Sequence, residues 1–225
     1  MEIQQPAMVF PEPHGQEKGN GMLKHELKPS FAGWGMAAHI LWKYPGWNLP
    51  VGRPWWKGAM EIDCVEIHRG FVPGTIGSVT EMHGTYYHAH WGFGSFFESK
   101  VAGEMAEFIG RYDEKRDGLW IALRNKRVEG SIVIDGIHAR EEGAHLRWFI
   151  VSDAFRGRGI GGRLIRRALE FCRQKAYERV YLWTFEGLHP ARHLYEKSGF
   201  QLTEEHPGTQ WGREVLEQRF ELRIQ

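Results

Sequence analysis

The sequence predicts an α/β domain in which a mixed, mostly antiparallel β-sheet is flanked by helices. Three observations predict this fold class. Short apolar or alternating runs, typical of strands, recur along the chain. Longer segments carry apolar residues at three- and four-residue spacing, which is typical of helices that pack on a core. A glycine-rich loop joins the densest apolar run to the helix that follows it.

Residues 60–225 are predicted to form this domain, because the orderly part of the sequence begins at Met60. Residues 1–59 are rich in Trp, Pro and Gly, and they sustain no period of 3.6 or 2. Two interpretations of them stay open. They form an aromatic appendage that packs on the domain or on a second subunit, as in a homodimer, or natural translation begins at Met60. We assign them no chemistry.

The segments before the glycine-rich loop predict a strand, two helices and three further strands. They are residues 62–69 for the first strand, 75–90 and 95–112 for the helices, and 119–125, 128–137 and 144–152 for the other strands. Asn125 and Lys126 are expected to form a tight turn between two of these strands. The apolar run from Trp148 to Val151 suits a central, buried strand.

The segments after the loop predict a helix, a strand, a short helix and a hairpin. The apolar stripe of the first helix contains Ile160, Leu164, Ala168 and Cys172. A strand follows at 179–185, and a short helix at 188–200 has Pro190 in its first turn and Gly199 at its end. Residues 200–206 and 215–224 are predicted to pair as an antiparallel hairpin at the end of the sheet.

The loop after the buried strand has the composition of an anion-binding site. A helix N-terminus presents backbone N–H groups and a favourable dipole to a phosphate, and glycine lets the anion approach the backbone. The residues expected to contact it are Arg156, Gly157, Arg158, Gly159, Ile160, Gly161 and Gly162. A glycine-rich surface turn would contain the same residue types. The strand before the loop and the helix after it favour the binding site.

The same letters match the dinucleotide-binding pattern G-x-G-x-x-G through Gly157, Gly159 and Gly162. That interpretation requires an acidic residue at the end of the next strand and further parallel βαβ units. The strand at 179–185 ends without one, and Glu186 follows only in a loop. Too few βαβ units remain, so we do not favour a Rossmann domain.

Three stretches together resemble the GNAT superfamily of N-acetyltransferases. R-G-R-G-I-G at 156–161 matches the superfamily pattern Arg/Gln-x-x-Gly-x-Gly/Ala. Val151 stands where the superfamily begins V-x-P-x-x-R, and ARHLYEKSGF at 191–200 matches A-x-x-L-Y-x-x-x-G-F. The resemblance covers about residues 62–224 and is closest to the acetyltransferase domain found behind MarR-type DNA-binding domains. We find no winged helix in this sequence, so gene regulation is not carried over.

The resemblance implies a GNAT fold with a splayed pair of parallel central strands, and acetyl-CoA as the acetyl donor. The pantetheine arm would pair with the backbone of Phe149, Ile150 and Val151 like an added strand. The pyrophosphate would rest on the amides from Gly157 to Gly162. Asp153 stands where the superfamily often has proline, a departure that we expect to be harmless.

Tyr195 matches the tyrosine that the superfamily places near the CoA sulfur as a general acid. Acetyl transfer needs a neutral amine, a stabilised oxyanion and a proton for the departing thiolate. An amide of the splayed strand, that of Ile150 or Val151, is expected to hold the oxyanion. The alternative role of Tyr195 is that of a core aromatic on an amphipathic helix.

The general base is less well defined. Some relatives carry a glutamate on the strand before the Tyr195 helix, where this chain has Trp183 and Thr184. The other candidates are Glu81, His83, Glu98 and His206. A relay through ordered water is the alternative to all of them.

His83, His88 and His90 raise the question of a metal site. Only positions 83 and 90 share a face of a helix, and no carboxylate or cysteine completes a zinc-binding spacing. We predict no metal. Several aromatic residues are expected either to line an acceptor pocket or to pack in the core. They are Tyr86, Tyr87, Trp91 and Trp211.

Composition narrows the class of protein. A formal net charge of +1 does not indicate a nucleic-acid partner, and the basic helix after the glycine loop has the pattern of a solvated face. Cys64 and Cys172 form no metal or redox motif, which favours a reducing, cytoplasmic compartment. No run approaches the roughly 18 apolar residues of a membrane span, and the N-terminus is unlike a secretory signal. We expect no membrane partner.

These observations predict an acetyl-CoA-dependent N-acetyltransferase that acts on the amine of a small metabolite or an amino-acid-like acceptor. Direct transfer is expected because no cysteine lies at the predicted reaction centre. Two other functions stay open. One is a non-catalytic sensor that binds acyl-CoA, favoured by the missing strand glutamate. The other is acetylation of the N-terminal or lysine amines of proteins and peptides.

Overall fold

The computed structural model describes residues 65–224, and each predicted helix and strand has a counterpart there. The elements are β1 (Glu66–Arg69), α2 (Thr75–Trp91), α3 (Ser95–Gly110), β2 (Gly118–Arg124), β3 (Arg127–Asp135), β4 (Ala144–Val151), the 3₁₀ turn η1 (Asp153–Phe155), α4 (Ile160–Gln174), β5 (Arg179–Phe185), α5 (His189–Lys197), β6 (Gln201–Gly208) and β7 (Val215–Arg223). The expectations for residues 1–59 and for the start of the first predicted strand lie outside the described residues.

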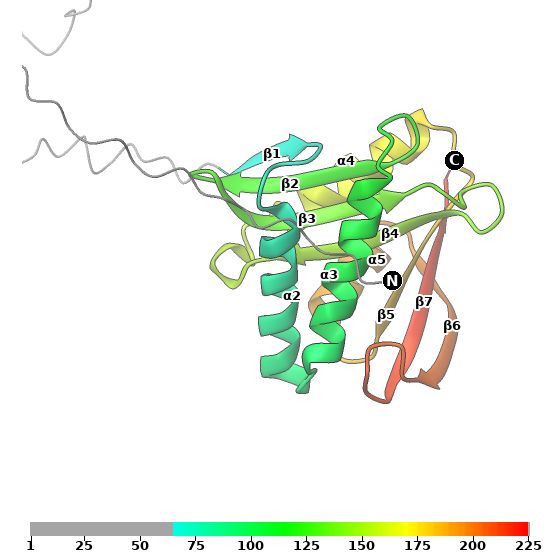
Figure 1. The fold of residues 1–225 in the computed structure, drawn as a ribbon. Helices are drawn as coiled ribbons and strands as arrows, with labels where there is room; N and C mark the ends of the chain where they lie inside the picture. The colour runs from blue at the N-terminus through cyan, green and yellow to red at the C-terminus, as the bar shows by residue number, and fades with distance from the viewer. Residues whose placement is uncertain (1–64, 225) are drawn as a thin grey trace, which may run out of the picture. The chain divides into compact units, whose positions relative to one another are not determined.

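The strands form one seven-stranded sheet in the order β1-β2-β3-β4-β5-β7-β6. Neighbouring strands are antiparallel except β4 and β5, which are parallel. The prediction of a mixed, mostly antiparallel sheet is therefore confirmed, as is the hairpin at its end. In Figure 1, β1 to β4 run across the view and β5, β7 and β6 run down it, with α2 and α3 in front.

Each face of the sheet has its own hydrophobic core. One core contains the buried stripe of α4 and Tyr195 of α5, packed on strand residues such as Ile132 and Leu182. The other contains the apolar faces of α2 and α3, with Val79, Met105 and Phe108 among the most deeply buried side chains. The predicted stripe of α4 is confirmed by the burial of all four of its members. The arginines on its other side are exposed at 163, 166, 167 and 173.

Turns occur at the residues that the sequence marked for them. Asn125 and Lys126 both adopt positive φ angles, 49° and 65°, between the paired residues Arg124 and Arg127. Two consecutive left-handed residues form a turn whose twist matches that of the strands it joins. Gly199 follows α5 with φ at 95°, which only glycine adopts without strain. β6 runs two residues beyond its prediction through Pro207, which the sheet accommodates because β6 is an edge strand.

β4 is interrupted by a bulge at Trp148. Val133 of β3 faces Arg147, but Ser131 faces Ile150, so two residues of β4 oppose one of β3. Trp148 has φ at 43°, an unusual value for a residue with a side chain. Because of the bulge, Trp148 packs in the core of α2 and α3. Residues before and after it pack on the α4 side.

The parallel pairing of β4 with β5 is very short. It joins only Ala144 to Val180 and His145 to Tyr181, so the rest of β4 has no partner on the β5 side. The bulge begins a few residues later, and the two strands diverge (Figure 1). The predicted splayed pair of central strands is therefore confirmed, and it leaves backbone groups of β4 facing a slot rather than a strand.

Replacing Ser131 with alanine is expected to destabilise the fold by about 1–3 kcal/mol. The Ser131 side chain is fully buried, and its hydroxyl donates a hydrogen bond to the Trp148 carbonyl at 2.6 Å. Losing the donor leaves a buried carbonyl of the bulge without a partner, which costs about that much. Urea unfolding measures the change. The matched control Ser99→Ala, on an exposed position of α3, should stay within about 0.5 kcal/mol of the wild type. Equal stability of the Ser131 variant and the wild type would contradict the expectation.

Candidate active site

The glycine-rich loop leads from β4 into the first turn of α4. Gly157 and Gly159 adopt φ of 74° and 76°, left-handed values that a Cβ would strain. Gly159 directly precedes α4, whose first intrahelical acceptor is its carbonyl, bonded by the Arg163 N–H. The N–H groups of Ile160, Gly161 and Gly162 belong to the helix turn that has no intrahelical acceptor. The loop therefore presents several amides at a helix N-terminus, the geometry that binds phosphate.

A groove of about 580 Å³ lies along this loop and the slot of β4. Its wall contains most of the residues that the sequence singled out for cofactor binding, namely Phe149, Ile150, Val151, Arg156, Gly157, Gly159, Ile160, Gly161 and Gly162. Arg158 does not line it, and its guanidinium lies 5.0 Å from the centre of the Phe155 ring. The space is narrow at Gly161, where a Cβ would lie 3.0 Å from Leu194 and 3.3 Å from Phe149.

Within residues 65–224, the slot edge of β4 carries backbone N–H groups that donate to no neighbouring strand. The Ser152 N–H donates to Glu129 of β3, and N–H groups alternate sides along a strand. The N–H groups of Phe149 and Val151 therefore point toward the slot, and that of Ile150 points toward β3. Of the two amides expected to hold an oxyanion, only that of Val151 faces the slot.

Arg156 stands at the edge of the groove. Its guanidinium lies 3.9 Å from the centre of the Tyr86 ring and pairs with the Asp153 carboxylate at 2.8 Å. Asp153, at the position where the superfamily often has proline, therefore forms an ion pair within the loop that proline could not form. Arg156 is partly exposed, so it can contact a phosphate in the groove.

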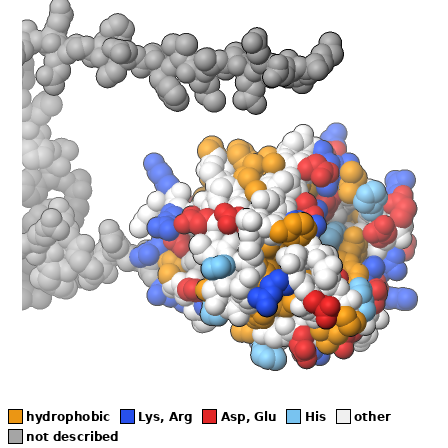
Figure 2. Space-filling model, turned by 60° about the horizontal axis from the view of Figure 1, so that its bottom comes forward, with side chains coloured by type: hydrophobic (Ala, Val, Ile, Leu, Met, Phe, Trp, Pro, Cys, Tyr) orange, Lys and Arg blue, Asp and Glu red, His pale blue; other side chains and the backbone are white. Residues whose placement is uncertain are grey.

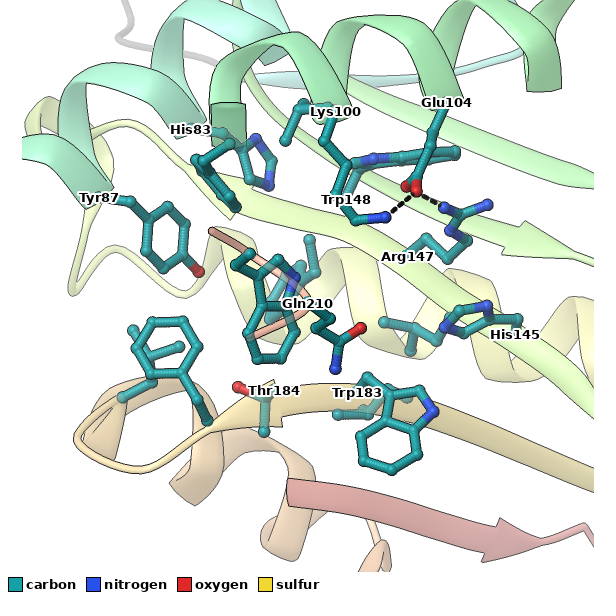
Figure 3. Close-up of a pocket in the computed structure, with 18 of the residues that line it drawn as sticks. His83, Tyr87, Lys100, Glu104, His145, Arg147, Trp148, Trp183, Thr184 and Gln210 are labelled. Carbon is teal, nitrogen blue, oxygen red and sulfur yellow. Dashed lines mark hydrogen bonds and ion pairs between the residues drawn. The ribbon is translucent and has the colours of Figure 1, made fainter. Parts of the chain in front are cut away.

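A second, smaller cavity of about 260 Å³ lies on the α2 and α3 side of the splayed strands. Three groups of elements supply its polar lining: helices α2 and α3, strands β4 and β5, and the loop between β6 and β7. Figure 3 shows polar side chains from all three around one space. The polar residues that line it are His83, Lys100, Glu104, His145, Arg147, Thr184 and Gln210. Tyr87 and Trp211 also line it, whereas Tyr86 lines the groove and Trp91 lines neither.

The two cavities meet at Tyr87, Phe149 and Leu188, which line both. Tyr195 lines the smaller cavity next to this junction, with its ring 6.0 Å from that of Phe149. It is only 6 % exposed, and burial raises the pKa of its phenol well above the usual value, with a further rise from Tyr87. Its hydroxyl therefore stays protonated at neutral pH. A ligand in the groove could thus place its end beside Tyr195, facing a molecule in the second cavity.

His83 points from α2 into the smaller cavity. Its Nδ1 lies 2.8 Å from the Val79 carbonyl oxygen, so Nδ1 carries the hydrogen and Nε2 is free to accept one. Burial lowers the pKa of the ring to about 4. His83 is therefore a neutral hydrogen-bond acceptor at physiological pH.

The structure does not bring the other candidate bases to the same place. Glu81 is exposed and lines a separate depression between α2 and the start of β3. Glu98 is also exposed and lies against Gly84, while His206 lies beside Trp183 with its ring edge-on. None of the three lines the groove or the smaller cavity. Thr184, at the position of the missing glutamate, does line the cavity.

The remaining histidines of α2 have structural partners or face solvent. His88 is exposed, and its Nδ1 bonds to the Phe93 carbonyl oxygen at 2.8 Å, which fastens the turn after α2. His90 is exposed beside Tyr86. Within residues 65–224, no three His, Cys, Asp or Glu side chains are grouped in a way that could hold a metal ion.

Sequence reasoning missed a chain of charges in the smaller cavity. Glu104 pairs with Lys100 on its own helix and with Arg147 of β4, as the dashed lines in Figure 3 mark. Arg147 also lies 3.5 Å from Asp135, which Arg111 holds through two hydrogen bonds. The spacing of Lys100 and Glu104 would suit a surface pair, and nothing in the sequence connects them to residue 147. Only the packing of α3 on β4 does so.

Figure 2 views the molecule from the end where α2 turns into α3 and β6 into β7. Lys and Arg side chains are interspersed there with Asp and Glu, around hydrophobic and histidine side chains. No helix within residues 65–224 has the length and apolar character required to cross a membrane.

Comparison with known families places the central part of the chain. The family described as the acetyltransferase (GNAT) family matches residues 79–200, from within α2 to the third residue after α5. The match includes β4, the glycine-rich loop and Tyr195. The match ends before the β6–β7 hairpin, whose connecting loop lines the smaller cavity.

Curated proteins give partial matches of moderate identity. An uncharacterized N-acetyltransferase of Methanocaldococcus jannaschii is 29 % identical over 121 residues, which are 52 % of this chain and 53 % of the relative. The N-acetylaspartate synthetase of Rattus norvegicus is 33 % identical over 118 residues, which are 52 % of this chain and 39 % of that protein. The chain thus spans about half or less of the length of these relatives.

Solved structures share the fold at low identity. An acetyltransferase of the same family from Staphylococcus aureus superposes with a TM-score of 0.58 at 14 % identity, over 72 % of this chain and all of that one. A structure of yncA from Salmonella typhimurium, described as containing acetyl-CoA, gives a TM-score of 0.54 at 15 % identity, over 71 % of this chain and 95 % of that one.

Proposed function

This chain belongs to the GNAT family of acetyltransferases, and on that premise we propose that it transfers the acetyl group of acetyl-CoA directly to the amine of a small, amino-acid-like acceptor. The observation that carries the proposal is the meeting of two cavities at the splayed strands. One cavity is built for a phosphate-bearing arm and the other is lined by polar groups. Tyr195 lies where they join.

The groove fits the donor. The loop amides at the start of α4 suit the pyrophosphate, and the free slot edge of Phe149 and Val151 suits the amide groups of the pantetheine arm. Acetyl-CoA would supply the acetyl group as a thioester at the junction of the cavities. The low-identity structural relative whose description includes acetyl-CoA supports the same choice.

The residues at the junction can perform the proton transfers that the reaction needs. The Tyr195 hydroxyl, kept protonated by burial, can donate its proton to the departing thiolate. The slot-facing N–H of Phe149, which lines both cavities, can stabilise the oxyanion, and that of Val151 is left for the pantetheine arm. His83 Nε2 can accept a hydrogen bond from the acceptor amine or from a water that carries its proton away. Cys172 is buried in the α4 core and lines neither cavity, which supports direct transfer.

The acceptor side supports a small substrate. A cavity of about 260 Å³ holds a molecule of roughly the size of an amino acid, and its wall has both cations and neutral polar groups. The rat relative is named for the acetylation of aspartate. L-Aspartate is therefore the first acceptor to test. The same proposal places the enzyme in the cytoplasm with no nucleic-acid or membrane partner, in line with its mixed charge and buried thiol.

A thiol-release assay with acetyl-CoA tests the proposal on the full chain. The panel contains the twenty free amino acids, ethylamine, spermidine and a peptide with a free N-terminus. We expect release with one or more free amino acids and little with the peptide. Turnover on the peptide alone would favour a protein acetyltransferase. Measurable CoA affinity without turnover would favour the sensor. The absence of both CoA binding and turnover would overturn the proposal of acetyl transfer for this chain.

The pH dependence should report the acceptor amine and not His83. Because the pKa of His83 is lowered to about 4, its neutral form persists from pH 9 down to about pH 4, and protonation removes it only below that. The logarithm of kcat/KM should therefore rise with slope one toward the amine pKa, which lies between about 8 and about 10.4. Assays from pH 5 to 9 measure the profile. An inflection near pH 6.5 that disappears in His83→Gln would contradict the expectation.

A further inference from the structure

Gln210 reaches the smaller cavity from outside the part of the chain that matches the family. It lies in the loop between β6 and β7, beyond the matched residues 79–200. Its side chain lines the cavity, and Figure 3 places it between Trp148 on one side and Trp183 and Thr184 on the other. The loop therefore contributes a polar group to the acceptor site that the family match does not cover.

A buried carboxylate holds Gln210 in place. Glu217 of β7 is 4 % exposed, and its two oxygens accept two hydrogen bonds from the same residue. Oε1 accepts from the Gln210 backbone N–H at 2.9 Å, and Oε2 accepts from Gln210 Nε2 at 2.5 Å. Gly208 makes room for this arrangement, because a Cβ there would overlap the Glu217 carboxyl group. Both the backbone and the side chain of Gln210 are thus fixed by one group.

The chemistry of Glu217 decides which way the Gln210 amide faces. A carboxylate oxygen accepts hydrogen bonds and cannot donate them, so the amide nitrogen must face Glu217. The orientation of this amide follows from its partner, which is the sound way to assign one. The carbonyl oxygen Oε1 then faces away from Glu217, and in Figure 3 it lies in the open space between β4 and β5. Within residues 65–224 it accepts no hydrogen bond from the protein.

We propose that Gln210 is a specificity-determining residue of the acceptor site, whose Oε1 accepts a hydrogen bond from an N–H group of the acceptor, and that Glu217 is its positioning residue. The proposal rests on the proposed acetyl transfer, since it concerns the acceptor of that reaction. A fixed neutral oxygen favours an acceptor that presents a hydrogen-bond donor at that position, and the group that does so here is an N–H. Gln210 is exposed to solvent, so the selectivity expected is that of one net hydrogen bond, about tenfold.

Three variants of the full chain test the proposal, in thiol-release assays with acetyl-CoA and the free amino acid that gives the highest wild-type kcat/KM in the panel. Gln210→Met removes the oxygen at similar size. Gln210→Glu sets two carboxylates against each other. The double variant Gln210→Glu/Glu217→Gln exchanges the two groups. It can form hydrogen bonds at the same two positions, with the side-chain donor and acceptor reversed and an oxygen of residue 210 still facing the cavity. Gln201→Met, on exposed β6, is the matched control.

We expect Gln210→Met to raise the KM for the amino acid about tenfold or more, with kcat and the KM for acetyl-CoA within about twofold of the wild type. Gln210→Glu should raise the KM for the amino acid at least as much. The double variant should return that KM to within about threefold of the wild-type value. An unchanged amino-acid KM in Gln210→Met, or no recovery in the double variant, would overturn the proposal.

Amide hydrogen exchange separates failure of this proposal from failure of the proposed function. The Gln210 backbone N–H should exchange slowly in the wild type and fast in Glu217→Gln, whether or not any acceptor is acetylated. If no amino acid supports turnover, the proposed function fails, and slow exchange still supports the positioning by Glu217. Fast exchange of Gln210 in the wild type would overturn the positioning, whatever the assay gives.

Discussion

Replacing Tyr195 with phenylalanine is expected to lower kcat by about 10²- to 10³-fold while CoA affinity stays within about twofold. The substitution removes one oxygen from a ring that is packed among Phe149, Phe200 and Phe220. The loss expected for a general acid is about 10²- to 10⁴-fold. The hydroxyl has no hydrogen-bond partner within residues 65–224, so its removal should not destabilise the fold. Steady-state kinetics and calorimetric titration with CoA measure the two quantities.

Tyr177→Phe is the matched control for this prediction. Its hydroxyl donates a hydrogen bond to the Arg116 carbonyl at 2.5 Å, and Tyr177 lines neither cavity. The control should lose about 1 kcal/mol of stability and keep its kcat. If Tyr195→Phe keeps the wild-type kcat, the hydroxyl is not the proton donor and the ring serves the core alone.

Gly162→Asp is expected to weaken CoA binding by about 100-fold or more and yet to stabilise the free protein. Gly162 is the third residue of α4, it lines the groove, and a Cβ there would have no atom within 4 Å. Removing a helical glycine and adding an anion to the first turn each stabilise a helix by roughly 0.5–1 kcal/mol. The same anion would face the pyrophosphate. Thermal unfolding and calorimetric titration with CoA should therefore change in opposite directions.

Gly77→Asp is a closely matched control. Gly77 is also the third residue of its helix, α2, and a Cβ there would likewise have no atom within 4 Å. It lines neither cavity, so this variant should gain stability without losing CoA affinity. If both variants bind CoA as the wild type does, the amides of the α4 N-terminus do not hold the pyrophosphate.

Local patterns in the sequence were enough to predict most of the fold. The four-residue spacing of Ile160, Leu164, Ala168 and Cys172 predicted the buried face of α4, since every such residue falls on one side of a helix. Asn125 predicted a turn because asparagine tolerates positive φ better than most residues that carry a side chain. The glycine-rich loop was predicted as an anion site from its own residues, whereas the role of Tyr195 came from the resemblance. In the structure the loop lines the groove, and Tyr195 lines the neighbouring cavity.

The rest of the candidate site depends on contacts that no local pattern encodes. The bulge at Trp148 changes which face the following residues take, so alternation along β4 cannot give their positions. Glu81 and His83 are two residues apart on α2, and their side chains therefore point to different cavities. Gln210 and Glu217 come together only because β6 and β7 pair. A hairpin was predicted there, but its register and the burial of a carboxylate were not.

The short contact between β4 and β5 also bears on how the domain holds together. Within residues 65–224, only two residue pairs join the strands of the first half of the sheet to those of the second. The two hydrophobic cores, which both contain residues of the two halves, therefore carry most of the connection. An extended arm that hydrogen-bonds along the slot would fill the gap between β4 and β5 and so join the two halves of the sheet. Binding to the folded protein alone would raise the free energy of unfolding by an amount that grows with the ratio of free thioester concentration to Kd, so saturation with the thioester would help to keep the protein folded.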